Sequence, residues 1–458
     1  MKETLALFQR IANNLLEQEE QAPVAPYVPT ERLLELLDLG LEAEGVSEER
    51  LESVLQELVL RTPRTATTGF FNQLFGGRND KAVLGDLLSV MLNNSMYTYK
   101  AAGPQVGVEK EIIQQLNNRL GWEEGGGTFG PGGSMTNFMS MLMARDARDG
   151  EVRYKGVHKS YTVYTSTESH YSVPKNAAFA GIGRDQVRYV PVDDQGRMIP
   201  QELRQMIEAD LHAGYLPVLI NATAGTTVLG AFDPIEPLAI IARKFNIWLH
   251  VDGAYCGAVL LSSKYKHLIA GIEQVDSFSV NAHKMLGTPL SCSMLLVKDK
   301  KWMYRSFSND ASYLYQTDHD EFNLGKTSLQ CGRRNDALKL WTIWKFVGTK
   351  GLEAIVDKQF QLADVARDYI KDHPDYQLYS FDESISVCFN YKGIPAKELC
   401  TALYESAQLL VGYGSFNDVE FVRLVTINAQ NSPEVILDFF QTLEQYVAQH
   451  ADRFSLSV

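Results

Sequence analysis

A lysine and an aspartate in the middle of the 458-residue chain each follow a short apolar run. Asp252 follows the run 247–251, and Lys284 lies shortly after the run 277–280. Such runs predict buried strands, and an open α/β sheet collects polar residues at the carboxyl ends of its strands, where ligands bind. Taken alone, each residue is more often a surface lysine or a turn aspartate. As a pair, an amine and a carboxylate facing one space could hold a cofactor between them.

The cofactor that suits such a pair is pyridoxal phosphate. Its aldehyde forms a Schiff base with a lysine amine, and a carboxylate keeps its pyridine nitrogen protonated. A phosphate site is predicted in the segment 128–137, where glycines lead into a helix expected over 138–145. Glycines allow close backbone approach, and a helix N-terminus offers free N–H groups. The alternative is an ordinary turn, and the glycines are not followed by a Walker sequence.

Two other segments could complete the cofactor site. His170 is a candidate for stacking on the cofactor ring, although a single histidine is more often a hydrogen-bonded structural residue. The segment 221–227 follows the apolar run 216–220 and brings small hydroxyl residues to another strand end. Its alternative interpretation is a glycine turn. The four parts occur in an order that is consistent with one cofactor site.

These segments belong to motifs that extend over most of the chain. From about Phe70 to the C-terminus, the chain resembles the group II pyridoxal-phosphate-dependent amino-acid decarboxylases, in the branch with glutamate, cysteine sulfinate and aspartate decarboxylases. The motifs are Phe-Phe-Asn-Gln-Leu (70–74), Pro-Gly-Gly (131–133), Ala-Gly-Thr-Thr-Val-Leu-Gly-Ala-Phe-Asp-Pro (224–234), His-Val-Asp (250–252), His-Lys (283–284) and Gln-Cys-Gly-Arg (330–333). The resemblance implies an α/β fold of type I, similar to aspartate aminotransferase. Its large domain has a mostly parallel seven-stranded sheet, and a smaller α+β domain follows.

The resemblance also implies roles for individual residues. The catalytic set would be Lys284, which holds the cofactor as a Schiff base, Asp252 at the pyridine nitrogen and His170 stacked on the ring. The remaining cofactor residues would be Ala254 on the other ring face, Thr223 near the ring, and Gly133, Ser134, Asn281 and His283 around the phosphate. Arg423 matches the arginine that binds the substrate α-carboxylate, although a single arginine in a strand is more often part of a surface ion pair.

Three positions of the substrate pocket point to a short acidic amino acid. Phe75, Ser95 and Tyr97 match the cysteine sulfinate branch of the family. A bulky Phe75 would shorten the pocket and favour aspartate, cysteine sulfinate or cysteate, and Gln73 could donate hydrogen bonds to the side-chain anion. The segment 285–290 is more similar to the glutamate branch. Decarboxylation of glutamate to GABA is therefore the alternative, followed by another pyridoxal phosphate decarboxylase of the aldehyde-forming or diaminobutyrate type.

The chain departs from the family pattern at two places. Thr67-Thr68-Gly69 stands where members usually have His-Pro-Arg. The loop between Asp310 and Gln330 is shorter, and Phe322 is the nearest match to a tyrosine that delivers a proton in many members. The aldehyde-forming alternative rests on Phe322, and His319 is a substitute candidate for the proton donor.

Composition limits the class of protein. A hydrophobic content of 45% and a charged content of 22% are typical of a globular protein. The net charge of −13 argues against a nucleic-acid or membrane surface as partner. The five cysteines have no C-x-x-C spacing, so we expect reduced thiols in a cytoplasmic protein and no bound metal. Neither a signal peptide nor a membrane span is expected.

The order of predicted elements suggests three parts, namely residues 1–60, 61–345 and 346–458. The first would be a helical segment for homodimerisation, with apolar stripes at Leu5–Leu16 and Leu33–Leu41. The second would be the cofactor domain, and the third the small C-terminal domain. Strands are predicted at 161–165, 187–191, 216–220, 247–251, 277–280 and 294–297, then at 377–380, 386–391 and 421–427. Helical patterns between most of the first six indicate a mostly parallel sheet.

Overall fold

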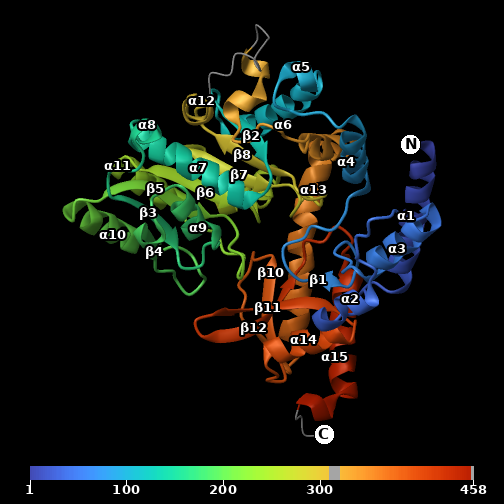
Figure 1. Cartoon of the computed structure of the whole chain (residues 1–458). Helices are drawn as coiled ribbons and strands as arrows, with labels where there is room; N and C mark the ends of the chain where they lie inside the picture. The colour runs from blue at the N-terminus through green and yellow to red at the C-terminus, as the bar shows by residue number, and fades with distance from the viewer. Residues whose placement is uncertain (309–319, 455–458) are drawn as a thin grey trace. The chain divides into compact units, whose positions relative to one another are not determined.

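The computed structural model describes residues 1–308 and 320–454, and the chain divides into two compact units (Figure 1). Unit 1 comprises Met1–Phe75, Leu362–Tyr379 and Val387–Val458, and unit 2 comprises Gly76–Gln361 and Ser380–Ser386. Residues 61–75 therefore group with unit 1, and residues 346–361 group with unit 2. The division into a dimerisation segment and two domains stays a prediction.

Unit 2 is built on a seven-stranded sheet with the order β2-β8-β7-β6-β5-β3-β4. Four of the six pairings, β4 with β3, β3 with β5, β5 with β6 and β6 with β7, are parallel, whereas β8 runs antiparallel to both β7 and β2. The mostly parallel sheet predicted from the sequence is thus confirmed. The strands are β2 (Gly126–Gly130), β3 (Tyr161–Ser166), β4 (Val187–Val190), β5 (Leu216–Thr223), β6 (Trp248–Gly253), β7 (Ser277–Asn281) and β8 (Ser293–Val297).

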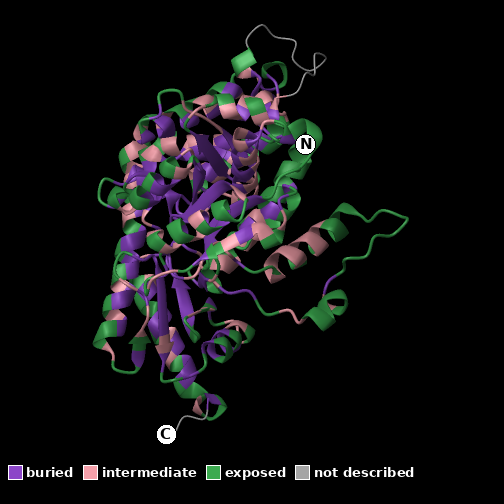
Figure 2. Ribbon diagram, turned by 90° about the vertical axis from the view of Figure 1, so that its left-hand side faces the viewer, coloured by how far each residue is buried: buried purple, intermediate pink, exposed green. Residues whose placement is uncertain are grey.

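Helices cover the sheet, so that its strands lie in the interior (Figures 1 and 2). Every residue of β3, β6, β7 and β8 is buried, although only β8 is close to a continuous apolar run, and β3 and β7 also bury Ser or Thr residues. The longer helices of unit 2 are α4 (Asp80–Leu92), α6 (Gln105–Leu120), α7 (Gly133–Arg148), α9 (Ser172–Phe179), α10 (Pro200–His212) and α11 (Ile235–Phe245). The shorter ones are α5 (Tyr99–Ala102), α8 (Val152–Lys155) and α12 (Lys301–Phe307), while α13 (Ala337–Asp372) bends at Gly348 and continues into unit 1.

The strand β2 was not among the predicted strands because it is rich in glycine. A side chain at Gly127 would lie 2.8 Å from the Leu295 carbonyl oxygen and 2.9 Å from Ile113 Cδ1. Close packing of β2 between β8 and α6 therefore excludes the β-branched residues that usually indicate a strand.

Unit 1 contains a five-stranded sheet with the order β1-β11-β12-β10-β9. Its strands are β1 (Phe70–Phe71), β9 (Tyr376–Leu378), β10 (Ser386–Tyr391), β11 (Leu410–Phe416) and β12 (Val419–Val425), and its helices are α1 (Lys2–Gln21), α2 (Leu33–Leu36), α3 (Glu48–Arg61), α14 (Ala396–Glu405) and α15 (Pro433–Gln449). The helical stripe predicted for Leu33–Leu41 is wrong beyond Leu36. Leu37 is buried but has an extended backbone, and Leu41 is fully exposed, so the helical spacing of the stripe is lost after Leu36.

Among the described residues, a helix that is long and apolar enough to cross a bilayer is not found, and neither is a cluster of three or more potential metal-ligating side chains.

Candidate functional site

The carboxyl ends of β5, β6 and β7 meet at a cavity of about 180 Å³ that also receives the first turn of α7. These strands run parallel and adjacent, with Thr223 opposite Asp252 and Gly253 opposite Val280, so the residues after each strand converge. The lining contains every cofactor residue predicted from the sequence, together with four further residues. It consists of Gly133, Ser134, Asn137, His170, Thr223, Gly225, Thr227, Asp252, Ala254, Tyr255, Asn281, His283 and Lys284.

The Asp252 carboxylate is buried and held by two donors. Asn137 Nδ2 donates to Asp252 Oδ2 over 2.6 Å, and the Ala254 backbone N–H donates to Oδ1 over 3.0 Å. Only 4% of the residue is exposed. A buried carboxylate needs such charge-assisted hydrogen bonds to offset the loss of water. The two hydrogen bonds therefore fix the orientation of the carboxylate, and each of its oxygens can still accept a further hydrogen bond.

The His170 ring lies in the cavity as a neutral group. The Ser172 backbone N–H donates to His170 Nδ1 over 3.2 Å, so the ring proton is on Nε2. Burial lowers the pKa of His170, with a smaller contribution in the same direction from the Lys284 charge, and Asp252 opposes them. A flat neutral ring of this kind can stack on an aromatic ligand.

The opposite end of the cavity is suited to an anion. The Cys292 backbone N–H donates to His283 Nδ1 over 3.0 Å, and burial is the main cause that lowers the pKa of His283 to about 4. His283 is thus neutral at pH 7 and presents a donor at Nε2. The Asn281 side-chain amide also lines the cavity and offers N–H donors. The backbone N–H groups in the first turn of α7 add donors and the positive end of a helix dipole.

Gly133, at the start of α7, is required by close packing. A Cβ atom at this position would lie 2.9 Å from Ala254 Cβ and 3.1 Å from Asn281 Nδ2. Contacts under 3.0 Å force a shift of one of the neighbours. The glycine therefore brings the helix N-terminus close to the residues that follow β6 and β7.

Lys284 and Thr223 complete the two sides of the cavity. Lys284 Nζ lies 6.0 Å from the centre of the Tyr255 ring, within cation–π distance. The Thr223 backbone N–H donates to Asp233 Oδ2 over 2.8 Å, which anchors the end of β5. Burial raises the pKa of Asp233 to about 7.

Asn137, Gly225 and Thr227 line the cavity and lie in segments predicted to belong to the cofactor site, although no individual role was predicted for them, whereas Tyr255 lies outside those segments. Asn137 is the last residue of the predicted phosphate segment, directly before the helix expected over 138–145. In the structure α7 already begins at Gly133, so Asn137 lies four residues into the helix and shares a face with Gly133. Tyr255 directly follows Ala254, but the residue type alone carries no indication of a site.

The substrate residues predicted from the sequence do not line this cavity. Ser95 and Tyr97 belong to unit 2, where the Arg333 backbone N–H donates to Ser95 Oγ over 3.3 Å and Gly325 packs against the Tyr97 ring. Phe322 lies near Tyr99, with 5.7 Å between the ring centres. His319 lies outside the described residues.

The other three substrate candidates belong to unit 1. Gln73 and Phe75 line a cavity of about 620 Å³ in that unit. The Phe75 ring is 5.7 Å from that of Phe70. Arg423 is 8% exposed and pairs with Gly412 across β11 and β12. A Cβ atom added at Gly412 would lie 2.4 Å from Asn72 Oδ1 and 3.9 Å from a guanidinium nitrogen of Arg423.

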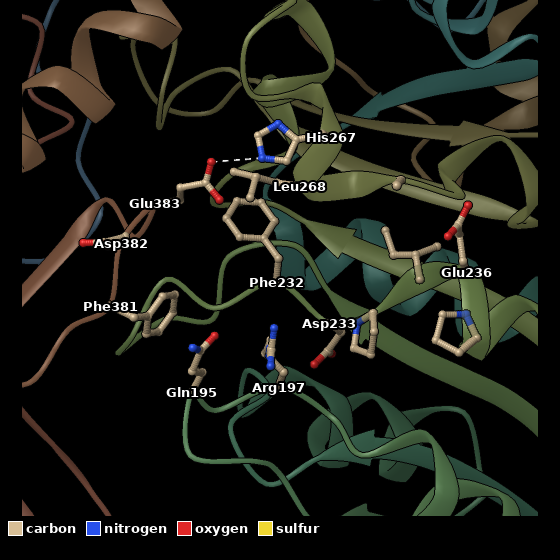
Figure 3. A pocket seen from close by; sticks show the side chains of 14 residues that line it. Gln195, Arg197, Phe232, Asp233, Glu236, His267, Leu268, Phe381, Asp382 and Glu383 are labelled. Atoms are coloured by element: carbon tan, nitrogen blue, oxygen red, sulfur yellow. Dashed lines mark hydrogen bonds and ion pairs between the residues drawn. The ribbon is translucent and has the colours of Figure 1, made fainter.

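A second cavity of unit 2, of about 290 Å³, lies on the other side of Asp233 (Figure 3). Two basic side chains in its lining, His267 and Arg197, are exposed and form ion pairs. His267 Nε2 is 2.9 Å from Glu383 Oε1, and Arg197 is 2.7 Å from Asp193. We therefore place the chemistry in the cavity that contains Lys284 and Asp252.

Comparison with known proteins gives the same result. A family model described as the pyridoxal-dependent decarboxylase conserved domain matches residues 31–392. Cysteine sulfinic acid decarboxylase of Rattus norvegicus is 40% identical over 372 residues, which are 80% of this chain and 76% of the rat protein. Acidic amino acid decarboxylase GADL1 of Mus musculus is 36% identical over 435 residues, which are 90% of this chain and 79% of the mouse protein.

The fold is also shared with a solved structure. The crystal structure of mouse CSAD superposes with a TM-score of 0.91 at 34% sequence identity, and the match covers 97% of this chain and 98% of that one. The fold type and the family predicted from the sequence motifs are confirmed by these matches.

Proposed function

We propose that this chain, which belongs to the pyridoxal-dependent decarboxylase family, removes the α-carboxylate of a short acidic L-amino acid as carbon dioxide and releases the amine. The family makes the enzyme a carboxy-lyase with pyridoxal 5'-phosphate as its cofactor. The observation that supports this proposal best is the convergence of Lys284, Asp252 and His170 on one cavity at the ends of parallel strands.

The residues that line the cavity fit the cofactor. Its phosphate needs donors, and the α7 N-terminus, Ser134 and the His283 Nε2–H supply them. Asn281 adds the N–H donors of its side-chain amide. The cofactor's pyridine nitrogen needs a carboxylate, and the buried Asp252 carboxylate is held in place by two hydrogen-bond donors. We assign these residues, with Gly133, Thr223 and Ala254, to cofactor binding.

The bound cofactor supplies an electron sink for the pair left on Cα when carbon dioxide departs. The chain supplies position and charge. We assign to Lys284 the covalent attachment of the cofactor through Nζ, to Asp252 the retention of a proton at the ring nitrogen, and to His170 the stacking contact. By resemblance to the family, Arg423 would bind the substrate α-carboxylate, because its planar guanidinium suits a carboxylate.

The acidic substrate is supported by the names of the relatives and by three residues. The relatives are described as cysteine sulfinic acid and acidic amino acid decarboxylases. Phe75, Ser95 and Tyr97 are the residues of the cysteine sulfinate branch, so we propose aspartate, cysteine sulfinate or cysteate as substrates. Gln73 would donate to the side-chain anion. Glutamate remains the alternative because the segment 285–290 is more similar to the glutamate branch.

We also propose that the protein is a homodimer. An apolar stripe on α4, formed by Leu84, Leu87, Leu88 and Met91, is between 41% and 51% exposed. A monomer rarely exposes such a stripe.

We propose a cytoplasmic location, which is a reducing compartment. All five cysteines are free, which is typical of cytosolic proteins.

Release of amine and carbon dioxide from a panel of amino acids tests the proposal. We expect turnover of aspartate, cysteine sulfinate or cysteate that depends on added pyridoxal phosphate, and no turnover by the Lys284→Ala variant. Aldehyde, ammonia and hydrogen peroxide in place of the amine would show the aldehyde-forming alternative. Turnover of neutral or basic amino acids alone would refute the acidic substrate.

A further inference from the structure

Behind Asp252, a chain of buried hydrogen bonds runs from the cavity into the sheet. Asn137 Nδ2 donates to Asp252 Oδ2 over 2.6 Å, and His250 Nε2 lies 3.0 Å from Asn137 Oδ1. His250 Nδ1 lies 2.9 Å from Ser277 Oγ, and Trp248 Nε1 donates to the same hydroxyl over 2.8 Å. His250 is fully buried. The chain links α7, β6 and β7 to one carboxylate.

The direction of each hydrogen bond follows from the carboxylate outward. An ionised Asp252 only accepts, so Asn137 must present its NH₂ group to Asp252 and its carbonyl oxygen to His250. His250 must then carry its proton on Nε2 and accept at Nδ1. Ser277 must donate to that nitrogen, and its oxygen accepts from Trp248, which can only donate.

A neutral His250 is required for this arrangement, and its burial provides it. Burial lowers the pKa of His250 to about 4. A second contact strengthens the position of Asn137, because its Nδ2 also lies 3.5 Å from Ser172 Oγ. Ser172 Oγ is in turn 2.8 Å from His170 Nδ1. One amide thus contacts the carboxylate directly and the stacking histidine through a serine.

We propose that Asn137 is a positioning residue that holds the Asp252 carboxylate directed at the ring nitrogen of the cofactor, and that His250 fixes the Asn137 amide in the orientation that this requires. The inference rests on the proposed role of Asp252. It adds two residues, for neither of which an individual role was predicted from the sequence.

The variant Asn137→Leu tests the first half, because leucine has a similar size but cannot donate. We expect the dissociation constant of pyridoxal phosphate, titrated into apo-protein by fluorescence, to rise roughly 10- to 100-fold, the range for one hydrogen bond to a charged group. The visible circular dichroism of the bound cofactor should also change. Arg148→Ala is the control on the same helix, since Arg148 donates to the Asn246 backbone oxygen and contacts no member of this hydrogen-bond chain.

The variants His250→Gln and His250→Leu test the second half. The Gln side chain retains an N–H donor for Asn137 Oδ1, whereas the Leu side chain does not. We expect His250→Leu to weaken cofactor binding and alter the visible circular dichroism, and His250→Gln to restore much of both. Equal behaviour of the two variants would overturn the role of His250.

Cofactor binding by the Asp252→Asn variant, measured in parallel, distinguishes an error in the role of Asn137 from an error in the role of Asp252. If Asp252→Asn weakens cofactor binding while Asn137→Leu binds like the native protein, the positioning role is wrong and the site stands. If both bind like the native protein, the assignment of Asp252 is wrong as well. A lower melting temperature of Asn137→Leu with unchanged cofactor affinity and spectrum would show a purely structural role.

Discussion

At the scale of single residues, the attachment of the cofactor depends on one amine. We expect Lys284→Ala to lower turnover on the order of 10³-fold or more, because a residue that acts as part of a catalytic unit cannot be replaced by the others. Borohydride reduction of the native enzyme followed by peptide mapping should place the cofactor on Lys284. Lys298→Ala, an exposed lysine after β8, is the control and should keep full activity. A label on any other lysine would remove Lys284 from the mechanism.

Phe75 is the residue to which we attribute selection by substrate length. One methylene is worth about 1–3 kcal/mol of discrimination, or roughly 10- to 200-fold. We expect native kcat/KM for aspartate or cysteine sulfinate to exceed that for glutamate by a factor in this range, and Phe75→Ser to narrow the ratio. Because Phe75 also packs against the cluster of Val24, Phe70 and Leu410, its melting temperature must be recorded in parallel. Loss of stability with an unchanged ratio would assign Phe75 to the core, and native preference for glutamate would contradict the pocket.

His250 should make stability depend on pH in a defined window. An exposed histidine in the unfolded chain titrates near pH 6.5, whereas burial lowers the folded pKa to about 4. Between these values only the unfolded state binds the proton, so the stabilisation is complete above pH 6.5 and falls as the pH drops towards 4. The loss from this residue between pH 7 and pH 5 is roughly 2 kcal/mol. In His250→Gln the difference in unfolding free energy between these pH values should shrink by this amount. An unchanged difference, by chemical denaturation at equal protein concentration, would contradict the buried neutral histidine.

At the scale of elements, the N-terminus of α7 is the part to which we assign phosphate binding. Gly133→Ala adds one Cβ atom at 2.9 Å from Ala254 Cβ, so the helix must move away from the cavity. We expect the dissociation constant of pyridoxal phosphate to rise by about tenfold or more, because the backbone N–H donors of α7 would then lie too far from the phosphate to bind it. Gly107→Ala in α6 is the control, because nothing lies within 4 Å of the added atom, and it should bind the cofactor normally. Normal cofactor affinity of Gly133→Ala would show that the helix N-terminus is not the phosphate site.

The sequence predicted those elements whose hydrophobic pattern is clear over a few consecutive residues. The strands β5, β6 and β7 were predictable because apolar runs end in polar residues, and the parallel arrangement then places Thr223, Asp252 and Asn281 at one edge. The strand β2 was missed because its glycines result from close packing with β8 and α6. Contacts that only form in three dimensions, such as that between His250 and Asn137 over 113 positions, leave no pattern in a single sequence.

At the scale of the whole molecule, the apolar stripe of α4 is the strongest indication of a partner. Leu84, Leu87, Leu88 and Met91 follow the spacing of one helix face, and that face is exposed in unit 2. Exposure of this apolar face to water is unfavourable, and a second copy of the chain that covered it would gain the free energy of burial. Stable homodimer interfaces are large and apolar, so a second copy is a suitable partner.

We therefore expect light scattering at micromolar concentration to give the mass of two chains. The double variant Leu87→Glu with Leu88→Glu should shift the protein to the monomer, because two charges would be buried in the interface without partners. Leu211→Glu on α10 is the control, since Leu211 is a similarly exposed leucine at 40% exposure on another element, and it should leave the mass unchanged. A monomeric native protein with full activity would contradict the dimer. A dimer that survives the double variant would instead place the interface elsewhere than on α4.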